Sequence, residues 1–86
     1  MEIKIRYTPR FVKHFRKVPS NIQKLVVNKE KIFKKDCFNS VLKTHKLSGN
    51  LSGFYSFSIN YSYRIVFSLE TSGIVFIDIG THSIYK

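Results

Sequence analysis

Acidic residues are scarce in this sequence, with five Asp and Glu against 15 Lys and Arg and a formal net charge of +10 at pH 7. This excess of positive charge is larger than solubility requires, and it attracts polyanions. RNA or DNA is therefore the first class of partner to consider, and an acidic protein is the second. A peptide that lies on a membrane surface fits less well, because the short amphipathic segments need their apolar faces for a core.

Cysteine is almost absent as well. Cys37 is the only one, which excludes an internal disulfide and favours the cytosol as compartment. One Cys and three scattered His lack the spacing of metal ligands, so no metal site is expected. Residues 48–53 contain two glycines but lack the Gly-Lys-Ser/Thr ending of a phosphate-binding loop. We therefore expect no metal and no other cofactor, and we interpret Cys37 as a small buried hydrophobic side chain.

Long apolar runs are missing too: the longest, residues 74–77, is too short to span a bilayer. The first seven residues alternate apolar and charged side chains and lack the apolar region of a signal peptide. We therefore expect a cytoplasmic protein with no membrane partner. Tryptophan is absent, but eight Phe and five Tyr can fill the core of one small domain over residues 1–86.

Residues 54–69 predict two β-strands that meet at a tight turn, because apolar and polar side chains alternate along both arms. Residues 2–7 and 74–79 predict two further strands by the same rule. The alternation gives the sheet two faces. Parity places Ser56, Ser58, Arg64 and Asp78 together on a polar face, which we expect to be open.

Two short helices are predicted between the first strand and the hairpin. Thr8 and Pro9 form a helix start, and an apolar stripe then continues to Pro19, which ends the helix. Ser20 and Gln23 have the spacing of a capping box and open the second helix. The order β-α-α-β-β-β predicts an α+β fold, with a twisted, mostly antiparallel four-stranded sheet and a two-helix hairpin on one face.

Residues 36–52 form the one long connection, and such loops in small domains are often functional. It carries Lys43, His45 and Lys46 to the edge of the hairpin. With Arg64 on the sheet and His82 and Tyr85 near the C-terminus, this set could cleave RNA without a metal. The reaction needs a base for the 2′-hydroxyl, an acid for the leaving 5′-oxygen and a fixed cation on the phosphate.

Structural interpretations of the same residues remain open. A histidine near a strand end is more often a structural or solvent-exposed residue than a catalyst. Arg64 could pair with Asp78 across the sheet. Tyr85 could contribute only a packed ring, His14 lies on the wet side of the first helix and receives no role, and the lysines of the second helix form, by default, a solvated face.

Three blocks of the sequence, residues 47–56, 63–67 and 78–82, resemble the RelE/ParE superfamily of toxins from prokaryotic toxin–antitoxin modules. The order of elements and the basic charge agree, and the resemblance covers nearly the whole chain. Within the superfamily the chain looks closest to the RelE and YafQ mRNA interferases, which cut messenger RNA in the ribosomal A site and are neutralised by a cognate antitoxin.

This resemblance implies roles for single residues. Arg64 matches the arginine that holds the scissile phosphate, while His45 and His82 match catalytic histidines of YafQ. Tyr85 falls near the C-terminal tyrosine of RelE. Ser56 and Ser58 stand where RelE has two lysines, so the catalytic set is a hybrid of the two types.

The resulting hypothesis is a ribosome-dependent mRNA endoribonuclease that needs no metal, with His45 as base, His82 as acid and Arg64 as phosphate clamp. Its partners would be mRNA, ribosomal RNA and an acidic antitoxin. The expected RNA contacts are Lys31, Lys34, Lys35, Lys43, Lys46, Ser56 and Ser58. Two alternatives are a ParE-like inhibitor of DNA gyrase without nuclease chemistry and an inactive RNA-binding relic.

Overall fold

The computed structural model describes residues 3–85, apart from the side chains of Ser83 and Tyr85. Within these residues, two helices and five strands follow the order β1, α1, α2, β2, β3, β4, β5, with three short 3-10 segments. Their bounds are β1 Ile5–Tyr7, α1 Pro9–Phe15, α2 Ser20–Lys35, η1 Ser40–Leu42, β2 His45–Lys46, η2 Gly49–Leu51, β3 Tyr55–Ser58, β4 Arg64–Glu70, β5 Gly73–Gly80 and η3 His82–Tyr85.

The strands form one sheet in the order β1-β5-β4-β3-β2, in which β1 is parallel to β5 and every other pair is antiparallel. The predicted α+β class and the mostly antiparallel sheet are confirmed. The predicted number of four strands is wrong, because the long connection contributes β2. Lys43 has a left-handed backbone (φ 53°) after η1, and His45 and Lys46 then pair with Ser56 and Tyr55. Two paired residues are too few to produce a readable alternation.

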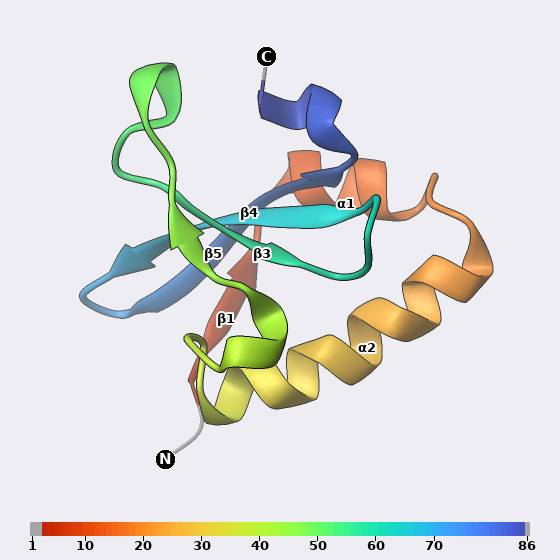
Figure 1. The fold of residues 1–86 in the computed structure, drawn as a ribbon, viewed down its shortest axis with the longest axis horizontal. Helices are drawn as coiled ribbons and strands as arrows, with labels where there is room; N and C mark the ends of the chain where they lie inside the picture. The colour runs from red at the N-terminus through yellow and green to blue at the C-terminus, as the bar shows by residue number, and fades with distance from the viewer. Residues whose placement is uncertain (1–2, 86) are drawn as a thin grey trace.

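The core lies between α2 and the sheet (Figure 1). Phe33 of α2 is fully buried, and its ring centroid lies 4.6 Å from Phe57, 5.0 Å from Phe67 and 5.3 Å from Phe76, one ring on each of the three central strands. Phe11 joins the same cluster from α1. The large aromatic side chains therefore supply the buried area that so short a chain needs.

The two helix starts differ. Thr8 caps α1 as predicted, since its hydroxyl oxygen accepts a hydrogen bond from the N–H of Phe11 at 3.1 Å. The capping box predicted for α2 is wrong: Pro19 is the N-cap, and its carbonyl accepts from the N–H groups of Ile22 and Gln23. The side chain of Gln23 instead donates to the carbonyl of Phe15 at 2.9 Å, which fastens α2 to the end of α1.

A β-bulge in β5 gives Asp78 its direction. Val66 pairs with Asp78 and Phe67 with Phe76, so Ile77 is an extra residue in β5. Such an insertion shifts the alternation of the faces by one residue. Phe76 and Ile79 therefore both enter the core, while Asp78 lies on the other face with Val66.

The face opposite α2 is more enclosed than predicted. Ser56, Val66 and Asp78 on it are 0%, 3% and 6% exposed. The loop between β2 and β3 and the η3 segment rise on this side of the sheet (Figure 1). His14 of α1 also reaches it and contacts Asp78. The expectation of an open polar face is therefore wrong for its centre, and its rim carries the exposed groups.

Candidate active site

The strand register brings the predicted site residues onto one face of the sheet. Residues paired directly across strands share a face. One row consists of His45, Ser56, Val66 and Asp78, and the next consists of Ser58, Arg64 and Gly80. Since neighbouring strands lie about 4.8 Å apart, His45 on β2 stands on the order of 10 Å from the β4 backbone.

Arg64 is fixed at the start of β4. Its Nη1 donates to the hydroxyl oxygen of Ser58 at 3.0 Å, and its Nη2 lies 3.0 Å from Nε2 of His82. Its Nε is buried and has no hydrogen-bond partner in the described part of the chain. A guanidinium held in this way keeps donors for an anion, and its planar fork matches a phosphate.

The contacts of the two histidines define their proton positions. A guanidinium can only donate, so Nε2 of His82 accepts from Arg64. Nδ1 of His45 lies 3.1 Å from the carbonyl oxygen of Lys43, which can only accept, so Nδ1 carries a proton. In the neutral ring this leaves the Nε2 lone pair of His45 able to take a proton. His45 and His82 are both exposed.

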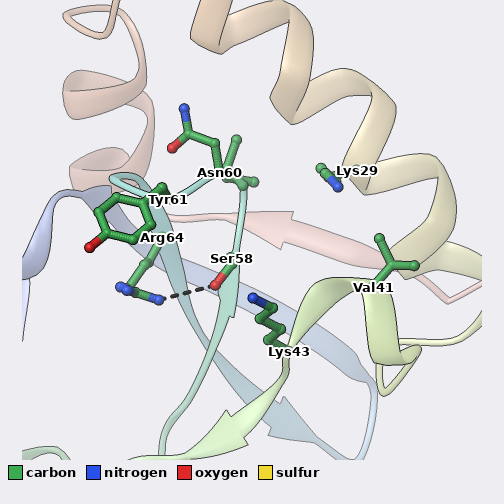
Figure 2. A pocket seen from close by; sticks show the side chains of 8 residues that line it. Lys29, Val41, Lys43, Ser58, Asn60, Tyr61 and Arg64 are labelled. Atoms are coloured by element: carbon green, nitrogen blue, oxygen red, sulfur yellow. Dashed lines mark hydrogen bonds between the residues drawn. The ribbon is translucent and has the colours of Figure 1, made fainter.

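A pocket of about 380 Å³ adjoins Arg64 on the side of α2 (Figure 2). Its walls come from α2, from η1 and the residue after it, from the end of β3, from the β3–β4 turn and from the start of β4. The lining residues are Lys29, Val41, Lys43, Ser58, Ile59, Asn60, Tyr61 and Arg64. Three of these side chains are cationic and none is acidic, so the pocket suits an anionic ligand.

Sequence reasoning missed Lys29 and Tyr61. Lys29 lies three residues after Val26 and four before Phe33, both buried, so it shares the sheet-facing side of α2. A lysine in an apolar stripe is the signal that could have identified it. Tyr61 is 94% exposed in the β3–β4 turn, and only the structure shows that this turn borders the pocket.

The other predicted RNA contacts are dispersed. Ser56 is fully buried between His45 and Val66, so it is not retained as a surface contact. Lys46 is exposed but follows His45 on the opposite face of β2. The side chain of Tyr85 lies outside the described residues.

The α2 lysines differ in their surroundings. Lys31 and Lys35 are exposed. Lys34 is partly buried and lies 3.8 Å from Glu30, one turn earlier on the same helix. Lys31 and Lys35 are therefore the members of this group that can most readily contact an external phosphate.

His14 and Asp78 form a contact that sequence reasoning also missed. Nδ1 of His14 lies 2.6 Å from one carboxylate oxygen of Asp78, and Nε of Arg10 lies 3.1 Å from the other. The alternative in which Arg64 pairs with Asp78 is therefore wrong, because α1 supplies the partners of this carboxylate. The contacts attach α1 to β5 beside the row that holds Arg64.

Two titratable side chains outside the site have perturbed pKa values. Burial raises the pKa of the Cys37 thiol, and the neighbouring Asp36 carboxylate raises it further. The thiolate is the nucleophilic form, so Cys37 does not suit nucleophilic catalysis at neutral pH. Burial also raises the pKa of Tyr7, followed by its hydrogen bond to Glu30, which ties β1 to α2.

Neither a metal site nor a membrane-spanning helix lies within the described residues. No group of three or more His, Cys, Asp or Glu side chains there could hold a metal ion. No helix in that part of the chain is both long and apolar enough to cross a membrane.

Comparison with known proteins gives one family and several solved structures. Residues 3–85 match the family described as bacterial toxin of type II toxin-antitoxin system, YafQ. YafQ from E. coli strain BL21(DE3) is 19% identical with a TM-score of 0.71, covering 98% of each chain. A YoeB/ParE toxin from Agrobacterium tumefaciens is 19% identical with a TM-score of 0.77, covering 93% of this chain and 99% of its own.

A third similar structure is the E. coli DinJ-YafQ toxin-antitoxin complex, with 19% identity, a TM-score of 0.69 and coverage of 98% and 97%. A comparison with curated protein sequences gives no match. At this level of identity the structures support the fold, and the family match extends over nearly the whole chain.

Proposed function

Because this chain belongs to the YafQ family of bacterial toxins from type II toxin–antitoxin systems, we propose that it is a metal-independent endoribonuclease that cleaves mRNA on the ribosome. The observation that carries the proposal is the arrangement at Arg64, a cation fixed by Ser58 and in contact with the imidazole of His82. A fixed cation beside a proton-transfer group is what cleavage of a phosphodiester requires.

The proposed reaction uses His45, Arg64 and His82. Nε2 of His45 takes the proton of the 2′-hydroxyl, and the 2′-oxygen forms a bond to phosphorus. Arg64 binds the non-bridging oxygens as negative charge gathers on them. The bond between phosphorus and the 5′-oxygen breaks, and His82 gives that oxygen a proton. The products are a 2′,3′-cyclic phosphate, which can open to a 3′-phosphate, and a 5′-hydroxyl.

The contact between Arg64 and His82 belongs to the state without substrate. For the acid role His82 must bind a proton at Nε2, which then can no longer accept from Arg64. A phosphate that takes the guanidinium replaces this contact and leaves the protonated ring beside the leaving oxygen. Binding of the phosphate to Arg64 is thus coupled to protonation of His82 at Nε2.

The proposed partners are the ribosome with its mRNA and an antitoxin. The similar E. coli YafQ forms a toxin-antitoxin complex with DinJ. For this chain, with its net charge of +10, we propose an antitoxin with an acidic segment that neutralises the basic surface. Lys31 and Lys35 of α2 are proposed to contact ribosomal RNA.

The test is primer extension on a reporter mRNA in a purified translation system, with and without ribosomes. We expect ribosome-dependent cuts from the wild-type protein and a loss of about 10²-fold or more in rate for Arg64→Ala, because the phosphate loses its cation. Arg64→Lys keeps the charge but lacks the planar fork, so it should recover only part of the rate.

Circular dichroism and thermal melting of each variant control for folding. An intact message at saturating wild-type protein, or equal cleavage by a folded Arg64→Ala protein, would contradict the proposal. Inhibition of gyrase supercoiling by the same preparation would then favour the ParE-like alternative.

A further inference from the structure

We propose that the pocket beside Arg64 is a nucleotide subsite, in which Lys29 and Lys43 bind a backbone phosphate adjacent to the scissile one and Tyr61 stacks on a base. The inference rests on the proposed action on RNA, and it extends the site from the reacting phosphate to the neighbouring nucleotide. It involves two residues, Lys29 and Tyr61, for which the residue pattern alone predicts no role.

The charge of the pocket selects the ligand. Lys29, Lys43 and Arg64 face a common volume of about 380 Å³ without an acidic side chain among the lining residues. None of the ion pairs in the described part of the chain involves any of these three side chains. Their mutual repulsion is therefore relieved only by solvent or by an external anion. A phosphodiester chain supplies such anions at regular intervals.

The arrangement of the side chains fits a nucleotide that continues from Arg64. Figure 2 shows Lys43 and Arg64 approaching Ser58 from two sides, with Lys29 extending from α2 and Tyr61 near Arg64. Ser58 is uncharged, and its hydroxyl oxygen already accepts a hydrogen bond from Arg64. The two lysines thus border the space next to Arg64, where the next phosphate of an RNA strand would lie. The pocket volume falls within the roughly 300–1,000 Å³ of sites for small ligands.

Tyr61 has an exposed side chain on a turn whose backbone is ordered by hydrogen bonds. Its side chain is 94% exposed, which leaves both faces of the ring open to a ligand. The turn around it is ordered by Asn60, whose side-chain oxygen accepts from the N–H groups of Ser62 at 2.9 Å and of Tyr63 at 2.8 Å. An exposed aromatic ring beside a cationic groove is the usual platform for an unpaired base.

The experiment measures the affinity of the full chain for a short single-stranded RNA with 2′-O-methyl groups, which cannot be cleaved. Fluorescence anisotropy should show about tenfold weaker binding for Tyr61→Ala and unchanged binding for Tyr61→Phe, because stacking needs the ring and not the hydroxyl. Lys29→Gln should weaken binding and reduce the slope of log affinity against log salt by about 0.7.

The matched control for charge is Lys24→Gln. Lys24 is an exposed lysine of the same helix outside the pocket, so this variant has the same net charge as Lys29→Gln. We expect it to bind the RNA almost as the wild type does. Equal losses for the two lysine variants, or wild-type affinity for Tyr61→Ala, would overturn the subsite.

A second arm uses an acidic peptide, polyglutamate, as competitor. If the pocket variants lost affinity for the peptide and kept their affinity for RNA, the pocket would be a protein-binding site and the proposal would be wrong.

A failure of the subsite proposal can be distinguished from a failure of the proposed nuclease function. A protein that cuts mRNA but binds RNA independently of Tyr61 and Lys29 keeps the proposed function, whereas pocket-dependent binding without cleavage keeps only the subsite.

Discussion

Asp78 carries a buried carboxylate on the face of the sheet that also holds Arg64. It accepts from Arg10 at 3.1 Å and from the N–H of Ile79 at 2.8 Å, and His14 lies at 2.6 Å. A buried carboxylate is retained only with such partners. At the scale of single residues, Asp78 therefore stabilises the position of α1 against β5.

Replacing Asp78 by Ala should lower the free energy of unfolding by about 2–3 kcal/mol, because these hydrogen bonds to a charged group are lost. Urea denaturation measures the change. Glu70→Ala is the control, since its ion pair with Arg6 spans 3.9 Å between exposed side chains and should contribute less than about 1 kcal/mol. Equal effects of the two substitutions would show that Asp78 has no special structural role.

The residues of the site differ in how well sequence reasoning located them. Arg64 and the strand serines could be placed on one face because alternation fixes the faces of a strand. His14 and Asp78 are 64 positions apart, and their contact depends on a bulge at Ile77 that no local pattern announces. The position of Lys29 in the apolar stripe of α2 can be read from the sequence. That Lys29 borders a pocket can be seen only in the structure, which places the end of β3 beside it.

At the scale of elements, η3 sets the position of His82. Gly80 ends β5, and a Cβ atom at this position would meet Cγ2 of Ile84 in η3. The absence of a side chain at Gly80 therefore allows η3 to fold back against the strand. Since η3 begins at His82, this close approach also places the imidazole beside Arg64.

We expect Gly80→Ala to lower the rate of mRNA cleavage by up to about 10²-fold, because displacement of η3 moves His82 away from the phosphate. Primer extension measures the rate. The double variant Gly80→Ala/Ile84→Ala removes the clash and should recover most of the loss, with Ile84→Ala alone as its control. A Gly80→Ala protein that cleaves like the wild type would show that η3 does not position His82.

The long elements could be predicted from the sequence, whereas β2 and the start of α2 could not. The helices and the three central strands were predicted because each has several turns or alternating positions. β2 has two residues, and it pairs because the left-handed backbone at Lys43 redirects the chain. The first turn of α2 was assigned to a capping box, whereas Gln23 bonds to α1, a tertiary contact that propensity does not include.

At the scale of the whole molecule, the net charge is +10, and the cations differ in whether an acidic side chain lies near them. Arg10 and Lys34 have acidic partners, while Lys31 and Lys35 are exposed on α2. Exposed cations that release counterions from RNA make binding dependent on salt. We therefore expect Lys31 and Lys35 to supply most of the long-range attraction in the proposed binding to the ribosome.

The double variant Lys31→Ser/Lys35→Ser should weaken ribosome binding and reduce the salt slope of its affinity by about 2. Cosedimentation with ribosomes at several salt concentrations measures both. Lys13→Ser/Lys17→Ser has the same net charge but changes exposed residues on and after α1, and it should have a smaller effect. Indistinguishable slopes would mean that net charge alone, not the α2 surface, governs the association.

The strand order determines when the sheet can form during synthesis. β5 lies between β1 and β4 in the sheet, yet it follows all other strands in the chain. During synthesis, β1 has no partner and Arg64 has no His82 until residues 73–82 have been translated and can fold. A nascent chain therefore contains the basic helices before Arg64 and His82 can meet, so the proposed active site cannot form until the last strand has been made.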